Sequence, residues 1–199
     1  MRDFTSFFLL LLVITIFYLY LENKASAVTF VVSTVDKQKY LVRNVPDKQE
    51  ASDLLANINK KLEIIVTHLD DNKETNEEYK KRITDIKRLK SNFASSTISE
   101  SSPGNKYTSY SINKGERIVF CLRDKDSEAK LIDENTILFV AIHELAHLMT
   151  KSIGHKKEFW DNMKFLLEVG IELGVYTKQD FASNPVKYCG TQITDTPLD

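Results

Sequence analysis

Two histidines four residues apart, with a glutamate directly after the first, are the residues of this sequence best suited to chemistry. His143 and His147 would lie one turn apart on the same face of a helix, so both rings can bind one metal ion. Glu144 stands beside that face, where it can accept a proton from a metal-bound water. This H-E-x-x-H pattern is typical of zinc hydrolases, and it predicts zinc (Zn2+) as the cofactor and Glu144 as the general base.

A zinc hydrolase site needs a third protein ligand and one position open to water. His155, eight residues after His147, is the candidate. A continuous helix would separate these two residues by about 12 Å along its axis, so the helix must end and the chain must turn back. Gly154 can adopt the left-handed conformation that ends a helix. The alternative third ligands are carboxylates of the next predicted helix, Glu168 and Glu172.

The histidines also have a purely structural interpretation, because isolated histidines are commonly surface groups or satisfied core groups. His68, alone near the end of a charged helix, is interpreted in that way. The other three histidines fall within thirteen residues of one another, which favours a shared role in metal binding.

The composition suits one domain with a substantial core. The chain has 199 residues, of which 42% are hydrophobic. Its formal net charge of -1 gives no electrostatic reason to expect nucleic acid as a partner. The two cysteines, Cys121 and Cys189, are too few for a disulfide framework. They are either free thiols or a single bridge in a domain that faces an oxidising compartment.

Residues 4–21 contain no charged side chain. At helical rise this stretch spans about 27 Å, close to the thickness of the hydrocarbon core of a bilayer. We therefore expect residues 1–24 to be a single-pass membrane anchor and residues 28–199 to be the catalytic domain. The alternative is a signal peptide cleaved near Ala25-Ser26-Ala27, which would release a secreted protein.

The domain is expected to be α+β, with two hairpins. Residues 28–32 and 39–43 are rich in strand-forming side chains and are separated by a short turn. Residues 107–112 and 116–123 show the same pattern just before the metal-binding helix. In a protease such a strand can pair with an extended peptide substrate, and the alternative is a plain scaffold.

Two amphipathic helices are expected between the hairpins. Apolar residues at helical spacing run from Lys48 to about Leu69, with Asp47 as the N-cap, and a second stripe follows at Tyr79, Ile83, Ile86 and Phe93. Basic side chains on the second helix alternate with acidic ones, which favours a solvated face over a nucleic-acid patch. The serine-rich residues 94–104 are interpreted as a flexible surface loop.

The metal-binding helix is expected to begin near Asp133 or Asn135, either of which can cap it. It is apolar nearly all round, so it must be buried at the centre of the domain. A further helix over residues 156–173 would pack on it. Tyr188 and Tyr176 are candidates to stabilise the oxyanion of a tetrahedral intermediate, and the alternative for both is a packing role.

The segments His143-Glu144-Leu145-Ala146-His147 and Gly154-His155-Lys156-Lys157-Glu158-Phe159-Trp160 resemble the H-E-L-x-H...H-x-x-x-F-W signature of WLM and SprT-like metallopeptidases, including the YgjP-like branch. The chain as a whole is similar to short membrane-anchored metallopeptidases of large DNA viruses. The resemblance implies a small zincin-like fold, with His143, His147 and His155 as zinc ligands and Glu144 as general base. The gap between the second and third histidines is usually five residues in the WLM pattern and is seven here.

The sequence thus predicts a membrane-anchored zinc endopeptidase that acts on a protein or peptide substrate, with residues 4–21 in the membrane and no nucleic-acid partner. One alternative is a catalytically inactive interaction module that zinc merely stabilises. Such structural sites usually close all four positions with protein groups, and neither cysteine lies near the motif. The other alternative is a protease of DNA–protein crosslinks, like better-known members of the family.

Overall fold

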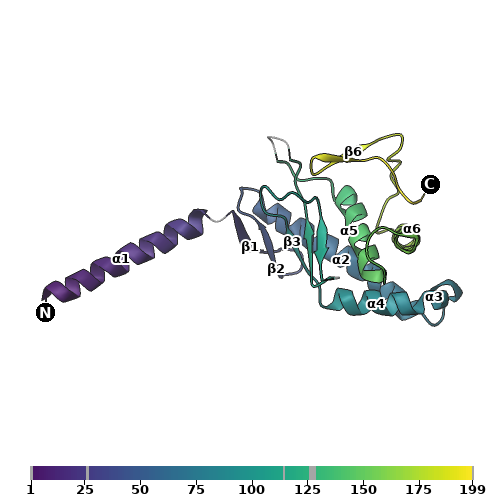
Figure 1. Cartoon of the computed structure of the whole chain (residues 1–199), viewed down its shortest axis with the longest axis horizontal. Coiled ribbons are helices and arrows are strands. Elements are labelled where there is room, and N and C mark those ends of the chain that lie inside the picture. The colour runs from purple at the N-terminus through teal and green to yellow at the C-terminus, as the bar shows by residue number, and fades with distance from the viewer. Residues whose placement is uncertain (1, 26, 114, 126–128, 199) are drawn as a thin grey trace.

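A computed structural model describes residues 2–25, 27–113, 115–125 and 129–198, which form an α+β arrangement with one long helix projecting from it (Figure 1). The elements in chain order are α1 (Arg2–Ala25), β1 (Val28–Val32), β2 (Lys39–Arg43), α2 (Lys48–Asn72), α3 (Glu77–Lys81), α4 (Ile83–Ala94), β3 (Thr97–Glu100), β4 (Tyr110–Ile112), β5 (Arg117–Phe120), α5 (Glu134–Met149), α6 (Lys157–Glu172), β6 (Val186–Tyr188) and β7 (Thr191–Ile193).

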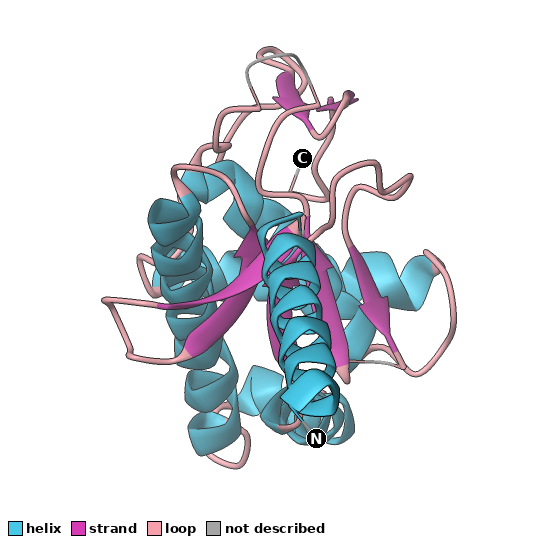
Figure 2. Ribbon diagram, turned by 90° about the vertical axis from the view of Figure 1, so that its left-hand side faces the viewer, coloured by secondary structure: helices cyan, strands magenta, loops and turns pink. Residues whose placement is uncertain are grey.

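The main sheet is mixed, and its strand order is β1-β2-β3-β5-β4. Both predicted hairpins are confirmed, because β1 pairs with β2 and β4 pairs with β5 in antiparallel fashion. Strand β3 lies between the hairpins and is parallel to β2 and to β5. Helices pack beside this sheet (Figure 2), and strand β4 forms one of its edges.

The surface loop predicted for residues 94–104 is wrong for Thr97–Glu100, which forms the central strand β3, whereas residues 102–104 are exposed and lie outside any strand or helix. The polar residues Ser99 and Glu100 of this strand are buried, and the Glu100 side chain is hydrogen-bonded. Glu100 is 3% exposed, and its carboxylate accepts hydrogen bonds from the Arg123 side chain at 2.9 Å and from the Arg43 backbone N–H at 2.7 Å. A buried carboxylate is tolerated when it is paired in this way, so the strand does not need an apolar sequence.

Asp47 is the N-cap residue of α2, as predicted. Its side chain makes no capping bond to that helix, and the carboxylate instead pairs with Arg123 at 2.5 Å. The second predicted helix is split into α3 and α4 at Arg82, whose φ of −112° departs from helical geometry. Asn76 caps α3 by accepting from the N–H groups of Glu78 and Tyr79.

Helix α5 occupies the centre of the helical layer, as its all-round apolar sequence predicts. It packs against α2, α4 and α6. Ile137, Leu138, Ile142 and Leu145 are fully buried. The Asp133 carboxylate caps the helix by accepting from the Thr136 N–H at 3.0 Å, as expected.

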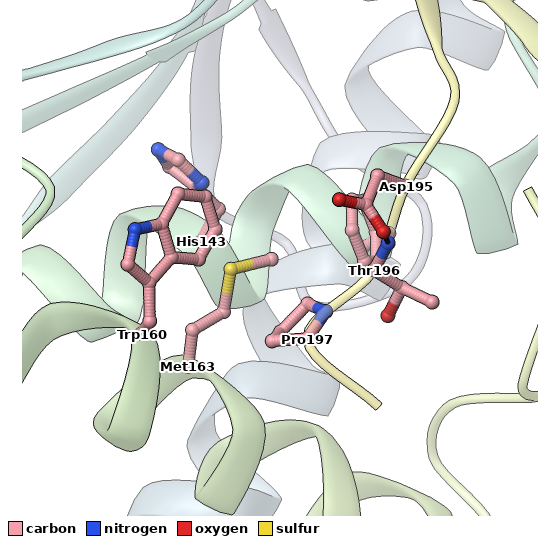
Figure 3. A pocket seen from close by; sticks show the side chains of 7 residues that line it. His143, Trp160, Met163, Asp195, Thr196 and Pro197 are labelled. Carbon is pink, nitrogen blue, oxygen red and sulfur yellow. Dashed lines mark hydrogen bonds between the residues drawn. The ribbon is translucent and has the colours of Figure 1, made fainter. Parts of the chain in front are cut away.

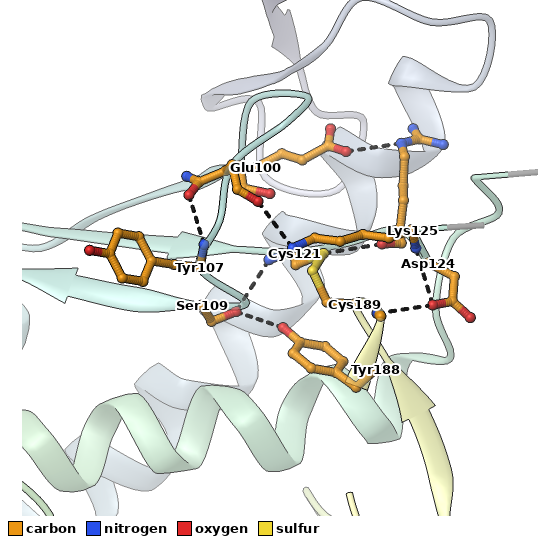
Figure 4. Close-up of a disulfide and its surroundings, with 12 residues drawn as sticks. Glu100, Tyr107, Ser109, Cys121, Asp124, Lys125, Tyr188 and Cys189 are labelled. Atoms are coloured by element: carbon orange, nitrogen blue, oxygen red, sulfur yellow. Dashed lines mark hydrogen bonds and ion pairs between the residues drawn. A yellow bond between two sulfur atoms is a disulfide. The ribbon is translucent and has the colours of Figure 1, made fainter. Parts of the chain in front are cut away.

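The two cysteines are joined in a disulfide, which decides between the two states that the sequence leaves open. The bond links Cys121, directly after β5, to Cys189 in the turn between β6 and β7 (Figure 4). Cys189 and Gly190 have φ values of +52° and +79°, which suit a two-residue hairpin turn. The C-terminal hairpin is therefore covalently fixed to the main sheet.

Helix α1 extends away from the rest of the chain (Figure 1). Its segment Thr5–Glu22 has a mean hydropathy of 2.0, and none of it is buried. This helix is long and apolar enough to cross a membrane, and a signal sequence would have the same properties.

Candidate metal centre

Helix α5 brings the first two histidines together. His143 and His147 are one turn apart, and their ring centroids are separated by 5.0 Å. The helix ends at Met149, because Thr150 is extended (φ −83°, ψ 133°). The prediction that Gly154 ends this helix is therefore wrong. Gly154 has a φ of +81° and sits in the returning loop, directly before His155.

The returning loop places the third histidine against the other two. Nε2 of His155 lies 3.1 Å from Nε2 of His143 and 3.1 Å from Nε2 of His147. Three imidazole nitrogens that share one tetrahedral zinc ion would be about 3.3 Å apart, given zinc–nitrogen bonds of about 2.0–2.1 Å. The alternative ligands Glu168 and Glu172 are exposed, and neither belongs to the cluster that the three histidines form within the described chain.

Glu158, in the first turn of α6, holds the returning loop. Its carboxylate accepts the backbone N–H groups of Lys151 at 3.1 Å and Ser152 at 3.3 Å. The nearby Ser152 side chain and these backbone bonds lower the pKa of Glu158. Asn162 adds a bond from its amide to the Thr150 hydroxyl at 3.0 Å. Sequence reasoning missed this positioning role, although Glu158 is part of the E-F-W segment that carries the resemblance.

Two aromatic side chains pack against the three histidines. The buried Phe159 ring lies 4.8 Å from that of His143, 4.4 Å from that of His147 and 4.6 Å from that of His155, between centroids. Trp160 packs on His155 at 5.7 Å. These contacts fix the ring orientations, as an outer layer of side chains commonly does around metal ligands.

Burial sets the protonation of this centre. Burial, followed by the nearby His147 and His155 rings, lowers the pKa of His143 to about 3, so its imidazole is neutral at neutral pH. The neutral ring is the form that binds a metal. Burial also raises the pKa of Glu144 to about 7, and a hydrogen bond with Ser111 acts in the opposite direction.

The residues present fit a metal ion with an attached water. Glu144 is only 4% exposed, and its Oε2 atom has no hydrogen-bond partner within the described chain. A buried carboxylate oxygen without a partner calls for an ion or a water that satisfies it. Three converging imidazoles beside that oxygen would supply three ligands and leave a fourth position open.

The histidines line a cleft of about 670 Å³. Its opposite wall is the segment 108–111, which enters the edge strand β4, and Ile153 and Gly154 of the returning loop complete it. A second cavity, of about 410 Å³, lies on the other side of His143 between α5, α6 and the C-terminal segment. His143 lines both cavities.

The other sequence candidates lie outside the cleft. Tyr188 is 3% exposed and its hydroxyl is hydrogen-bonded to that of Ser109 at 2.6 Å, while burial and the charge of Glu144 raise its pKa (Figure 4). Tyr176 is buried and packs on Phe139, with 6.2 Å between the ring centroids. Neither tyrosine is among the described residues that line the cleft. His68 packs on Tyr79, away from the cluster, in keeping with its structural interpretation.

Residues 66–197, well over half of the chain, match the WLM domain. The chain belongs to the WLM family. This family is metal-dependent and is associated with metallopeptidases.

Viral relatives extend the likeness beyond this domain. The chain is 33% identical to uncharacterized protein R325 of Acanthamoeba polyphaga mimivirus, over 96% of this chain and 94% of that protein. It is 37% identical to uncharacterized protein 136R of Invertebrate iridescent virus 6 and 39% identical to uncharacterized protein 042R of Invertebrate iridescent virus 3. Each of these two matches covers 41% of this chain, and they cover 44% and 48% of those proteins. No solved structure matches the chain.

Proposed function

We propose that this WLM protein is a membrane-anchored zinc endopeptidase with a zincin-like catalytic domain. His143, His147 and His155 hold the zinc ion, and Glu144 is the general base. The observation that supports this most strongly is the convergence of three Nε2 atoms beside a buried carboxylate oxygen that has no hydrogen-bond partner among the described residues. Three imidazoles with one open position are the ligand set of a catalytic zinc ion.

When bound, zinc would polarise the scissile carbonyl and lower the pKa of a coordinated water. Glu144 supplies the proton transfers: its buried carboxylate accepts the proton of the attacking water and later delivers it to the leaving amine. The returning loop and the Phe159 ring keep the three imidazoles in place during these steps.

Strand β4 supports a peptide as the substrate. It lies at the edge of the sheet, and the described chain pairs it only with β5. Its residues Tyr110 and Ser111 line the cleft together with Glu144. An extended peptide can bind there by adding a strand to the sheet, which leaves its carbonyl groups beside the histidines.

The disulfide and α1 support a domain held at a membrane on its oxidising side. Disulfides persist in secreted proteins, in the endoplasmic reticulum lumen and on virion surfaces. We propose that residues 1–24 remain attached as the anchor and that residues 28–199 form the catalytic domain. Mass spectrometry of the protein from membranes tests this, because a cleaved signal peptide would leave a chain that begins near Val28.

The function is tested by comparing the detergent-solubilised full chain with its Glu144→Gln variant. We expect about one zinc ion per chain in both proteins, and cleavage of unfolded casein by the parent protein alone. Full cleavage by the variant would exclude Glu144 as the base. Stoichiometric zinc without any cleavage by the parent would instead favour the zinc-stabilised interaction module.

A further inference from the structure

The cavity on the far side of His143 is built as a binding pocket. Figure 3 shows Trp160 and Met163, from α6, facing Asp195, Thr196 and Pro197 of the C-terminal segment across the opening. Phe139, from α5, completes the lining. The volume of about 410 Å³ is near the lower end of the range for small-molecule sites, about 300–1,000 Å³, so the pocket admits one bulky side chain rather than a folded segment.

The part of the pocket wall that Phe139, Trp160 and Met163 form is apolar and well supported. Met163 is 1% exposed and Phe139 is 6% exposed, and the Phe139 ring packs on that of Phe181 at 4.7 Å between centroids. Trp160 is 43% exposed, so its ring is available to an incoming group. An apolar side chain that enters this space would lose its contact with water and gain contacts with these rings.

The C-terminal wall is held in place by its own bonds. The Asp195 carboxylate accepts the Thr196 N–H at 2.7 Å, and Thr196 is 5% exposed. Leu198 packs against the hydrophobic core. Asp195 itself is exposed, so its carboxylate stays hydrated and does not require a cation to enter the pocket.

The position of the pocket links it to the metal centre. His143 lines both the pocket and the cleft, so a peptide whose carbonyl group lies at the histidines has a neighbouring side chain within reach of Trp160 and Met163. We propose that this pocket is the specificity site of the endopeptidase and that it binds a bulky apolar side chain, such as phenylalanine or leucine, next to the scissile bond. This inference rests on the proposed function.

Binding can be measured without turnover, because Trp160 is the only tryptophan of the chain and lies in the pocket wall. The probes are capped alanine-rich peptides that carry one Phe, Leu, Lys or additional Ala at each position in turn. They are titrated into zinc-loaded, full-length Glu144→Gln protein while the Trp160 emission is followed. We expect the best Phe and Leu peptides to bind about tenfold or more tightly than the all-Ala peptide, with a shift of the emission.

A matched pair of variants tests the pocket wall. Pro197→Phe places a ring in the opening and should remove most of the preference for Phe and Leu. Pro185→Phe makes the same substitution at an exposed proline outside the pocket, and this variant should retain the preference for Phe and Leu peptides. The peptide series on the parent protein remains decisive if Pro197→Phe fails to fold.

Equal binding of the Phe and all-Ala peptides would overturn the proposal, as would tightest binding of the Lys peptides or an equal loss of preference in both proline variants. The outcome is separable from that of the proposed function. Selective binding of apolar peptides without cleavage by the wild-type protein would support the proposed pocket and contradict the proposed endopeptidase function. Cleavage without selectivity for apolar side chains would support the function and contradict the pocket.

Discussion

Reduction of the Cys121–Cys189 disulfide should destabilise the fold while leaving the three-histidine centre intact. The bond joins positions 68 residues apart and fixes the C-terminal hairpin to the end of β5. The histidines, in contrast, are held by α5, by the returning loop and by the Glu158 carboxylate. The hairpin and the metal centre therefore depend on different contacts.

The magnitude follows from the length of the closed loop. A cross-link over 68 residues removes chain entropy from the unfolded state equivalent to about 4 kcal/mol at 25 °C. This is a large share of the 5–15 kcal/mol that is typical of a folded domain. The reduced protein should consequently unfold at a clearly lower denaturant concentration.

The assay is a urea titration of the zinc-loaded full chain, with and without a phosphine reductant, followed by the Trp160 emission. A Cys121→Ala/Cys189→Ala double variant is the control, because the reductant should not change its transition. Zinc content is measured before and after reduction, in the absence of urea. An unchanged transition on reduction would refute the stabilising role, and loss of zinc on reduction would refute the independence of the two regions.

Two further predictions concern individual residues, and a third concerns the net charge of the chain. Glu158→Gln should weaken zinc binding about 10- to 100-fold in competition with a chromogenic chelator, because the returning loop loses charged acceptor bonds, whereas Asp161→Asn, on the same helix, should not. A hydrogen bond from Arg123 lowers the pKa of Asp47, so this pair stabilises the fold above the unfolded-state pKa of about 4, and the stabilisation is lost as the pH falls through the folded-state value. The difference in unfolding free energy between wild type and Asp47→Asn should therefore shrink below about pH 4, and a constant difference would count against the pair. Addition of DNA should not stimulate peptide cleavage, because the net charge is only -1, and a salt-sensitive stimulation would indicate a crosslink protease.

The cluster of three histidines was predictable from sequence because its signal is local. The spacing of His143 and His147 is that of one helical turn, and a continuous helix would carry His155 too far along its axis to share an ion, so the chain must turn back before it. The residue at which the helix ends was not predicted correctly. The helix is capped at Thr150, whereas the sequence suggested Gly154. The loop is instead set by Glu158, whose partners are backbone groups that the sequence does not distinguish.

Features that depend on distant partners were the ones that sequence reasoning missed. The sequence of residues 97–100 resembles a polar loop because the Arg123 and Arg43 groups that satisfy Glu100 come from distant parts of the chain. The C-terminal residues Asp195–Pro197 resemble a polar tail in sequence, although they close a partly apolar pocket beside the three histidines. Whether the two cysteines form a disulfide was equally open, because their spacing in the sequence does not show whether they are in contact.

The central claim is that three imidazoles hold one zinc ion and leave a position for water. X-ray absorption at the zinc edge of the purified full chain tests it most directly. We expect three nitrogen neighbours with the scattering pattern of imidazole and one further oxygen, all at about 2.0–2.2 Å. A sulfur neighbour at about 2.3 Å, or a spectrum with fewer than three imidazoles, would contradict the claim.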